Sequence, residues 1–159
     1  MKQPHGTQLA QLNVATALDE LDSPRLASFV GALDRINTLA EQSPGFVWRL
    51  KDETGNATDI QTSADPRLIV NLSVWETPAD LEQFVWNTVH KRVYQKKAKW
   101  FEPPKSAYFV MWWVPAGHQP TAEEALARLA DLDANGPSEH AFGWESLPNI
   151  QLWKEQRCA

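Results

Sequence analysis

Residues 106–114, which read SAYFVMWWV, form a predicted strand that is apolar on both faces. Strands of antiparallel sheets commonly alternate instead, with one face toward a core and the other toward water. A strand that is apolar on both sides has to be covered on both sides, as in the centre of a layered domain or at a subunit interface. The sheet that contains this segment therefore needs a layer on each face.

Two other predicted strands carry a polar face. Residues 9–17 alternate apolar residues with Gln11 and Asn13, so one face of this strand is turned to something other than an apolar core. Residues 68–76 alternate in the same way, and their second face mixes polar groups with a large aromatic ring, which suits a ligand cavity better than a core. That face carries Asn71, Ser73 and Trp75.

A short strand is predicted at residues 46–50. Strict alternation places Phe46 and Trp48 on one face and Arg49 on the other. Arg49 is a candidate for holding a ligand carboxylate in a bidentate pair. The alternative is a surface bridge from Arg49 to an acidic side chain.

Three helices are marked by start signals. Ser23 is the expected N-cap of the first, Thr77 of the second and Thr121 of the third. The second helix is expected to run to about Phe101 and the third to Leu132.

The predicted order is strand, helix, strand, strand, helix, strand, followed by an extra helix and a short strand at residues 141–147. The first six elements form the split βαβ pattern of a ferredoxin-like fold with an antiparallel sheet. Such a sheet carries helices on one face, so we expect a partner sheet from a second subunit to cover the other. Residues 1–159 are expected to form a single α+β domain, with a core at about residues 9–147 and flexible ends.

Composition narrows the class of protein. The net charge of −5 argues against nucleic-acid binding, which needs a basic surface. No apolar run reaches the roughly 18 residues of a membrane span. The first residues lack an apolar segment, so we expect no secretory signal, and the single cysteine, Cys158, allows no disulfide within the chain. These features predict a cytoplasmic protein without a membrane contact.

Tryptophan is the compositional outlier, with eight residues in 159. The indole N–H needs a partner when it is buried, so ordinary cores use tryptophan sparingly. The tryptophans either fill the core and a subunit interface or wall an aromatic pocket for a flat apolar ligand. The sequence leaves both interpretations open.

Six segments carry a resemblance to a known superfamily; they read LAQLN, SPGFVWRL, NLSVWETPADLEQFVW, HKRV, KWFE and VMWWVPAGHQPT. Together they resemble the dimeric α+β barrel superfamily, which includes antibiotic-biosynthesis monooxygenases and haem-degrading monooxygenases. Within it they look most like an uncharacterised bacterial domain-of-unknown-function family. The resemblance implies a ferredoxin-like dimeric α+β barrel, a homodimer, and a monooxygenase that works either without a cofactor or with haem.

The haem-degrading relatives use an Asn on the first strand, a Trp on the second helix and a His further along that helix as iron ligand. The matching candidates here are Asn13, Trp86 and His90. The relatives place the Trp and the His farther apart than the four residues between Trp86 and His90. The resemblance thus implies catalytic roles for Asn13 and His90, with His90 as a general base or, if haem binds, as the metal ligand.

The leading hypothesis is a monooxygenase-type enzyme that acts on a flat apolar or aromatic small molecule in a Trp-lined pocket around His90. The alternatives are a non-catalytic small-molecule-binding protein and a haem-binding protein. His90 could instead be a boundary histidine, and the polar groups at positions 71 and 73 could satisfy each other. The substrate-binding candidates are Arg49, Asn71, Ser73, Trp75, Phe84, Trp86 and Trp100.

Overall fold

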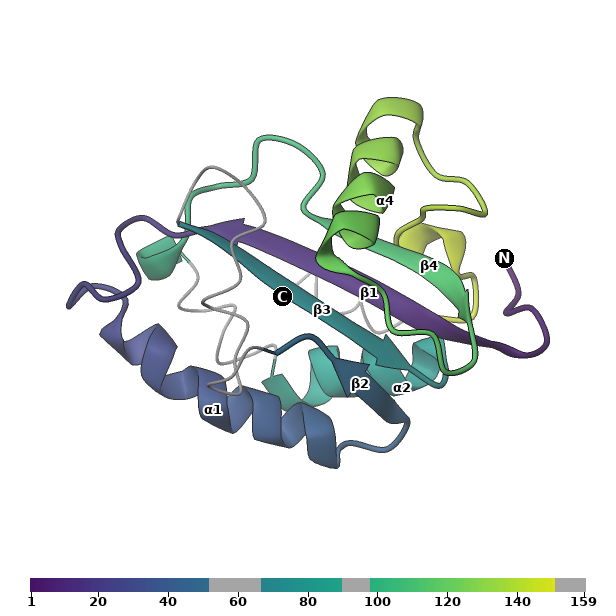
Figure 1. Ribbon diagram of the computed structural model, residues 1–159, viewed down its shortest axis with the longest axis horizontal. Coiled ribbons are helices and arrows are strands. Elements are labelled where there is room, and N and C mark those ends of the chain that lie inside the picture. The colour runs from purple at the N-terminus through teal and green to yellow at the C-terminus, as the bar shows by residue number, and fades with distance from the viewer. Residues whose placement is uncertain (52–66, 90–97, 151–159) are drawn as a thin grey trace.

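The computed structural model describes residues 1–51, 67–89 and 98–150 (Figure 1). Up to α4, strands and helices follow one another in the order that the sequence predicts. The labels η1 and η2 denote a π-helix and a 3-10 helix. The elements are β1 (Thr7–Thr16), α1 (Ala27–Gln42), β2 (Phe46–Arg49), β3 (Leu68–Trp75), α2 (Pro78–Glu82), η1 (Gln83–Val89), β4 (Phe109–Pro115), α4 (Ala122–Asn135) and η2 (Trp144–Ser146).

The four strands form one antiparallel sheet in the order β2-β3-β1-β4. In β1, Asn13 lies opposite Asn71 of β3 on one side and opposite Phe109 of β4 on the other. Because side chains directly opposite each other share a face, this register decides which residues meet. The antiparallel α+β fold class is confirmed, with β1 and β3 as the central strands.

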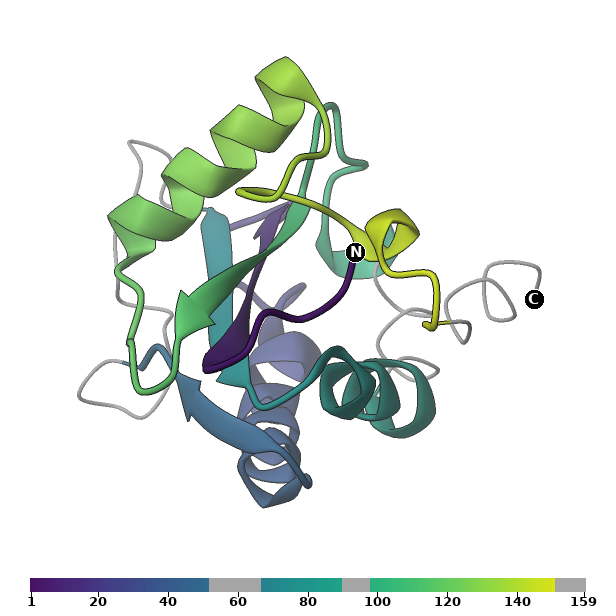
Figure 2. The ribbon, with the colours of Figure 1, turned by 90° about the vertical axis from the view of Figure 1, so that its right-hand side faces the viewer.

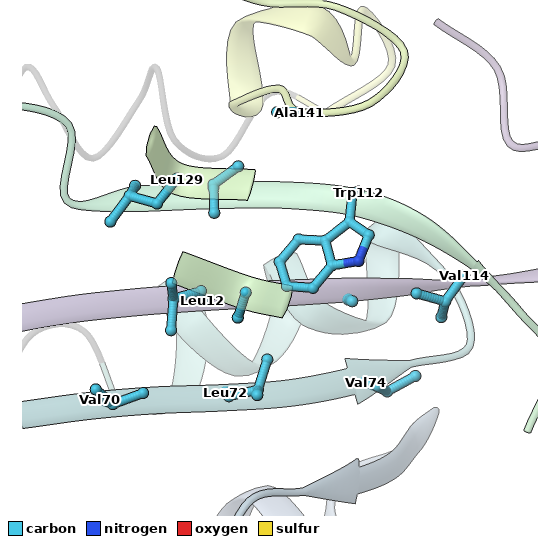
Figure 3. Close-up of a cluster of buried hydrophobic side chains, with 11 residues drawn as sticks. Leu12, Val70, Leu72, Val74, Trp112, Val114, Leu129 and Ala141 are labelled. Atoms are coloured by element: carbon cyan, nitrogen blue, oxygen red, sulfur yellow. The ribbon is translucent and has the colours of Figure 1, made fainter. Parts of the chain in front are cut away.

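One face of the sheet packs against α4, and α1 and α2 lie on the opposite face (Figures 1 and 2). The face toward α4 is a continuous apolar layer, drawn in Figure 3, which we call the α4-facing core. Its buried members come from β1, β3, β4, α4 and the segment after α4. They are Ala10, Leu12, Val70, Leu72, Val74, Val110, Trp112, Val114, Ala125, Leu129 and Ala141.

The position of α4 adds to the expected arrangement of layers. We expected helices on one face of the sheet and a second subunit on the other, but α4 occupies that second face. The buried residues of the α4-facing core are at most 9% exposed, and half-buried apolar residues such as Val14, Trp48 and Leu68 pack against them. On this face, α4 of the same chain therefore supplies part of the covering layer that the apolar strand at residues 106–114 demands.

Two apolar clusters lie on the face toward α1 and α2. The aromatic core gathers around Trp75 and Met111 at one end of this face, and the Trp100 cluster gathers around Ala17 at the other. The buried members of the aromatic core are Leu9, Ala40, Trp75, Leu81, Met111, Phe142, Leu147 and Ile150. Those of the Trp100 cluster are Ala17, Leu26, Phe29 and Trp100.

The short strand β2 departs from strict alternation. Its register shifts between Phe46, which lies opposite Trp75, and Trp48, which lies opposite Val74. Phe46 therefore contacts the Trp75 ring edge-on, with centroids 5.4 Å apart, while Trp48 packs against the α4-facing core. The prediction that these two residues share a face is wrong, because an irregularity in one strand reverses every side chain beyond it.

The helix starts agree with the sequence at two of three places. The Thr77 and Thr121 hydroxyls accept hydrogen bonds from the N–H groups of Asp80 and Glu124, at 3.2 and 3.1 Å, as N-cap residues do. The first helix starts later than predicted, with Leu26 at the N-cap and no side-chain cap.

Two further elements differ from the predicted ones. The second helix is α-helical over Pro78–Glu82 and continues as the π-helix η1 over Gln83–Val89. Its predicted course to about Phe101 crosses residues 90–97, which lie outside the described ranges. Residues 141–147, predicted as a strand, contain one isolated β-bridge between Phe142 and Met111 followed by η2. In the described part of the chain, no helix has the length and apolar character needed to cross a membrane.

Candidate functional site

Four polar side chains interrupt the face toward α1 and α2 between the aromatic core and the Trp100 cluster. Gln11 lies opposite Ser73, and Asn13 lies opposite Asn71, so they form a block on the two central strands. We call this block the polar patch. It is where the predicted polar faces of β1 and β3 meet, so the structure brings together the candidates Asn13, Asn71 and Ser73.

The inner half of the polar patch is a buried hydrogen-bond network. Gln11 and Ser73 are each 5% exposed. The Ser73 hydroxyl oxygen accepts hydrogen bonds from Gln11 Nε2 at 2.7 Å and from Trp75 Nε1 at 2.9 Å. Buried polar groups are costly unless they are bonded in this way, so the network fixes the geometry of the patch from below.

The outer half is accessible. Asn71 is exposed and Asn13 is half-buried. Asn71 Oδ1 accepts a hydrogen bond of 3.3 Å from Gln11 Nε2. None of the hydrogen bonds found in the described ranges involves the Asn13 side chain. The patch thus offers two amide groups side by side on a rigid sheet, with hydrogen-bonding capacity still to be used.

Half-buried aromatic rings lie on one side of Asn13. Its neighbour Phe109 stacks on Trp144 of η2 with centroids 5.6 Å apart and an interplanar angle of 11°. Trp86 of η1 meets Trp144 edge-on at 6.4 Å. These contacts place the candidate Trp86 in the same aromatic group as Phe109, next to the amide pair.

Other candidates have structural partners. Trp75 is 1% exposed and stacks on Phe84 with centroids 5.2 Å apart, so both rings belong to the aromatic core. Arg49 lies opposite Ser73, and its Nε donates a 2.8 Å hydrogen bond to Glu41 of α1. The bridge that the sequence left open as the alternative for Arg49 is therefore formed.

Trp100 stands apart from this group. It is buried in the Trp100 cluster against Phe29, with ring centroids 5.4 Å apart, and its Nε1 donates to the Ser28 hydroxyl at 3.0 Å. Within the described ranges, the tryptophans consequently do not line one wall. Apart from Trp86, they are distributed over the α4-facing core, the aromatic core and the Trp100 cluster.

His90 lies outside the described residues, so its predicted role as base or iron ligand stays a prediction. Haem iron would need an imidazole, thiolate, thioether or phenolate beside the patch. On the patch face, the Met111 thioether is fully buried in the aromatic core, and the Met1 thioether accepts a hydrogen bond from Trp113 Nε1. His118 bonds to Glu124 of α4, on the other side of the sheet. The described part of the patch therefore supplies no axial ligand, and no group of three or more metal-ligating side chains occurs within it.

Three residues of the site were not among the candidates: Gln11, Phe109 and Trp144. Gln11 was detectable, since it alternates with Asn13 on the polar face of the first strand. Phe109 was hidden in a strand that is apolar on both faces. Trp144 reaches the site only because Phe142 is bridged to Met111, and no local pattern predicts that contact.

These features define an α+β protein whose antiparallel sheet carries a polar, amide-bearing patch on its face toward α1 and η1. Residues 8–158 match the family described as Domain of unknown function (DUF3291), and the chain belongs to this family. No curated protein matches the sequence.

Two solved structures from Nitrosomonas europaea are similar in fold. One is a protein of unknown function, with a TM-score of 0.48 and 16% identity over 75% of this chain and 100% of the other. The second is a "putative antibiotic biosynthesis monooxygenase", with a TM-score of 0.45 and 14% identity over 76% of this chain and 100% of the other. The assignment of the family rests on the family match, and that of the fold on the strands and helices of this chain.

Proposed function

We propose that the polar patch binds a flat, oxygen-bearing aromatic molecule and that the chain oxidises it as a monooxygenase-type enzyme. The observation that supports binding is the pair Asn13 and Asn71 at the centre of the sheet. Apolar clusters pack against helices at both ends of this face, while Asn71 between them is exposed and Asn13 half-buried, so the amides lie in an opening between two packed regions. Two accessible amides flanked by half-buried aromatic rings are typical of a small-molecule site.

The amides and the aromatic rings would act on different parts of one ligand. Asn13 and Asn71 offer hydrogen bonds to a carbonyl or phenolic oxygen. The rings of Phe109 and Trp144 offer a surface for the flat body of the ligand. Turnover without a cofactor would need a substrate that supplies its own electrons, such as anthrone, whose CH₂ group reacts with O₂ to give C=O and water.

The amide pair is tested with 1,4-naphthoquinone, whose binding can be followed by quenching of tryptophan fluorescence. Replacing Asn13 or Asn71 with alanine is expected to weaken binding about 3- to 10-fold each, the value of one hydrogen bond. Asn135→Ala, at the end of α4, is the matched control and should bind like wild type. Equal affinity in wild type and the Asn13→Ala/Asn71→Ala double variant would exclude the patch as the site.

Oxidation of the substrate and binding of haem are tested by two separate measurements. Oxygen uptake with anthrone, above the rate of autoxidation without protein, is expected for wild type and reduced in Asn13→Ala. Tight quinone binding without uptake would favour the non-catalytic binding protein. A Soret shift on adding haemin that disappears in His90→Ala would favour the haem-binding protein.

We also propose that the chain forms a homodimer. Because α4 packs on the sheet face where a partner sheet was expected, the interface would lie beside α4 or on another surface. Light scattering at micromolar concentration is expected to give about twice the 18.0 kDa of one chain. A mass of one chain would contradict the homodimer.

A further inference from the structure

In the buried hydrogen-bond network of the patch, the donor and the acceptor of each bond can be assigned, because one of the groups can only donate. An indole N–H only donates. Trp75 Nε1 lies 2.9 Å from Ser73 Oγ, so this oxygen must accept on that side. Trp75 is 1% exposed and held between Phe46 and Phe84, so this reference point is rigid.

The orientation of the Gln11 amide follows from a second fixed group. The main-chain carbonyl oxygen of Asn71, which only accepts, lies 3.5 Å from Gln11 Nε2. Turning the Gln11 amide over would bring two acceptor oxygens together at that position. With Nε2 on this side, Gln11 donates to Ser73 Oγ at 2.7 Å and to Asn71 Oδ1 at 3.3 Å.

The Asn71 amide is oriented in turn. Its Oδ1 faces the Gln11 donor, so its Nδ2 points to the opposite side of the amide group. Asn71 is exposed, so we infer that its two Nδ2 hydrogens, which no hydrogen bond in the described ranges uses, are available to a ligand. The buried side chain of Gln11 thus decides whether Asn71 presents hydrogen-bond donors or an acceptor to a ligand.

We propose that Gln11 is a positioning and specificity-determining residue: it holds Asn71 with its N–H donors outward, so that the patch selects ligands carrying a hydrogen-bond acceptor over ligands carrying a donor. This inference rests on the proposed function, because it names the ligand chemistry of that same site. It also predicts what happens when the donor at position 11 is replaced by an acceptor. An ionised carboxylate at position 11 cannot donate, so Asn71 would turn its Nδ2 inward and present Oδ1 to the ligand. Because burial raises the pKa of a carboxyl group, this reversal is expected at alkaline pH, where the Gln11→Glu side chain is ionised.

The orientation can be tested without a ligand by hydrogen exchange of side-chain amides in wild-type protein, measured by nuclear magnetic resonance. The Gln11 Nε2 and Trp75 Nε1 hydrogens are expected to exchange slowly, and the Asn71 Nδ2 hydrogens quickly, because only the last are exposed. Fast exchange at Gln11 together with protection at Asn71 Nδ2 would overturn the proposed orientation, whatever the protein binds.

The selectivity is tested with two probes of similar shape, 1,4-naphthoquinone, which only accepts, and 1-naphthylamine, which donates. Wild type is expected to prefer the quinone. At alkaline pH, Gln11→Glu should lower the ratio of the two affinities about 10-fold or more, since one contact is lost for the acceptor and one is gained for the donor. Gln11→Leu, which releases Asn71 without reversing it, should lower the ratio less.

Gln8→Leu is the matched control, since Gln8 is also a buried glutamine of β1 and bonds to Glu76 and Gly117 away from the patch. It should leave the ratio unchanged even if it lowers stability. An unchanged ratio in a folded Gln11→Glu protein that still binds the quinone would overturn the role of Gln11 and leave the proposed function standing. Failure of wild type to bind either probe would overturn both.

Discussion

Replacing Trp112 with alanine is expected to lower the free energy of unfolding by about 3–5 kcal/mol, as for other large-to-small changes at fully buried aromatic residues. Trp112 is 0% exposed at the centre of the α4-facing core (Figure 3). Its Nε1 donates to Glu124 Oε1 of α4 at 3.3 Å, so the side chain joins β4 to the helix that covers it. Urea unfolding followed by circular dichroism measures the loss.

The adjacent Trp113 is the matched control. It points to the opposite face, is half-buried, and packs its ring against Phe142 with centroids 5.3 Å apart. Trp113→Ala removes the same atoms but less buried surface, so we expect a smaller loss of about 1–2 kcal/mol. Equal losses in the two variants would contradict the assignment of Trp112 to the more deeply buried layer.

The parts of the fold that depend on period-two alternation were predictable. The faces of β1 and β3 follow directly from their sequences, because neither strand contains a bulge and a two-residue repeat then decides every side chain. The same holds for α4, where the Thr121 capping box and the apolar spacing act together. These local signals agree with the packing they lead to, and this agreement is why they could be read from the sequence.

Tertiary packing overrode the local signals elsewhere. Ser23 and Pro24 look like a helix start, but α1 begins at Ala27, after Leu26 has been buried completely in the Trp100 cluster. In β2 the register shift separates Phe46 from Trp48, because each ring packs on a different side of the sheet. No pattern within these short segments could reveal the partner that decides their conformation.

The polar residues of the candidate site could be predicted from the alternation of two strands, but the aromatic rings beside them could not. Asn13, Asn71 and Ser73 share a face because of β-strand geometry alone. The tryptophans were selected by residue type, and their positions depend on contacts between distant segments, such as that of Trp86 with Trp144. Composition can indicate that a chain is rich in indoles, but only the packing decides which of them border the polar patch.

Gly45→Ala is the second substitution for which we expect a large loss, about 3 kcal/mol or more. Gly45 has φ +80°, a conformation that costs a residue with a Cβ about 1–2 kcal/mol. An added Cβ would also overlap the Asp80 side chain. Asp80 Oδ2 accepts a 2.7 Å hydrogen bond from the Thr77 hydroxyl at the start of α2, so moving Asp80 would disturb this cap as well.

Gly117→Ala separates the two causes. Gly117 has a similar φ of +88°, but nothing lies within 4 Å of the Cβ that alanine would add there. Only the backbone term then applies, and we expect a loss of about 1–2 kcal/mol. The difference between the two variants in urea unfolding therefore measures the overlap with Asp80. Equal losses would show that Asp80 moves aside freely. The turn before β2 would then not constrain the start of α2, the helix that leads into η1 and the site.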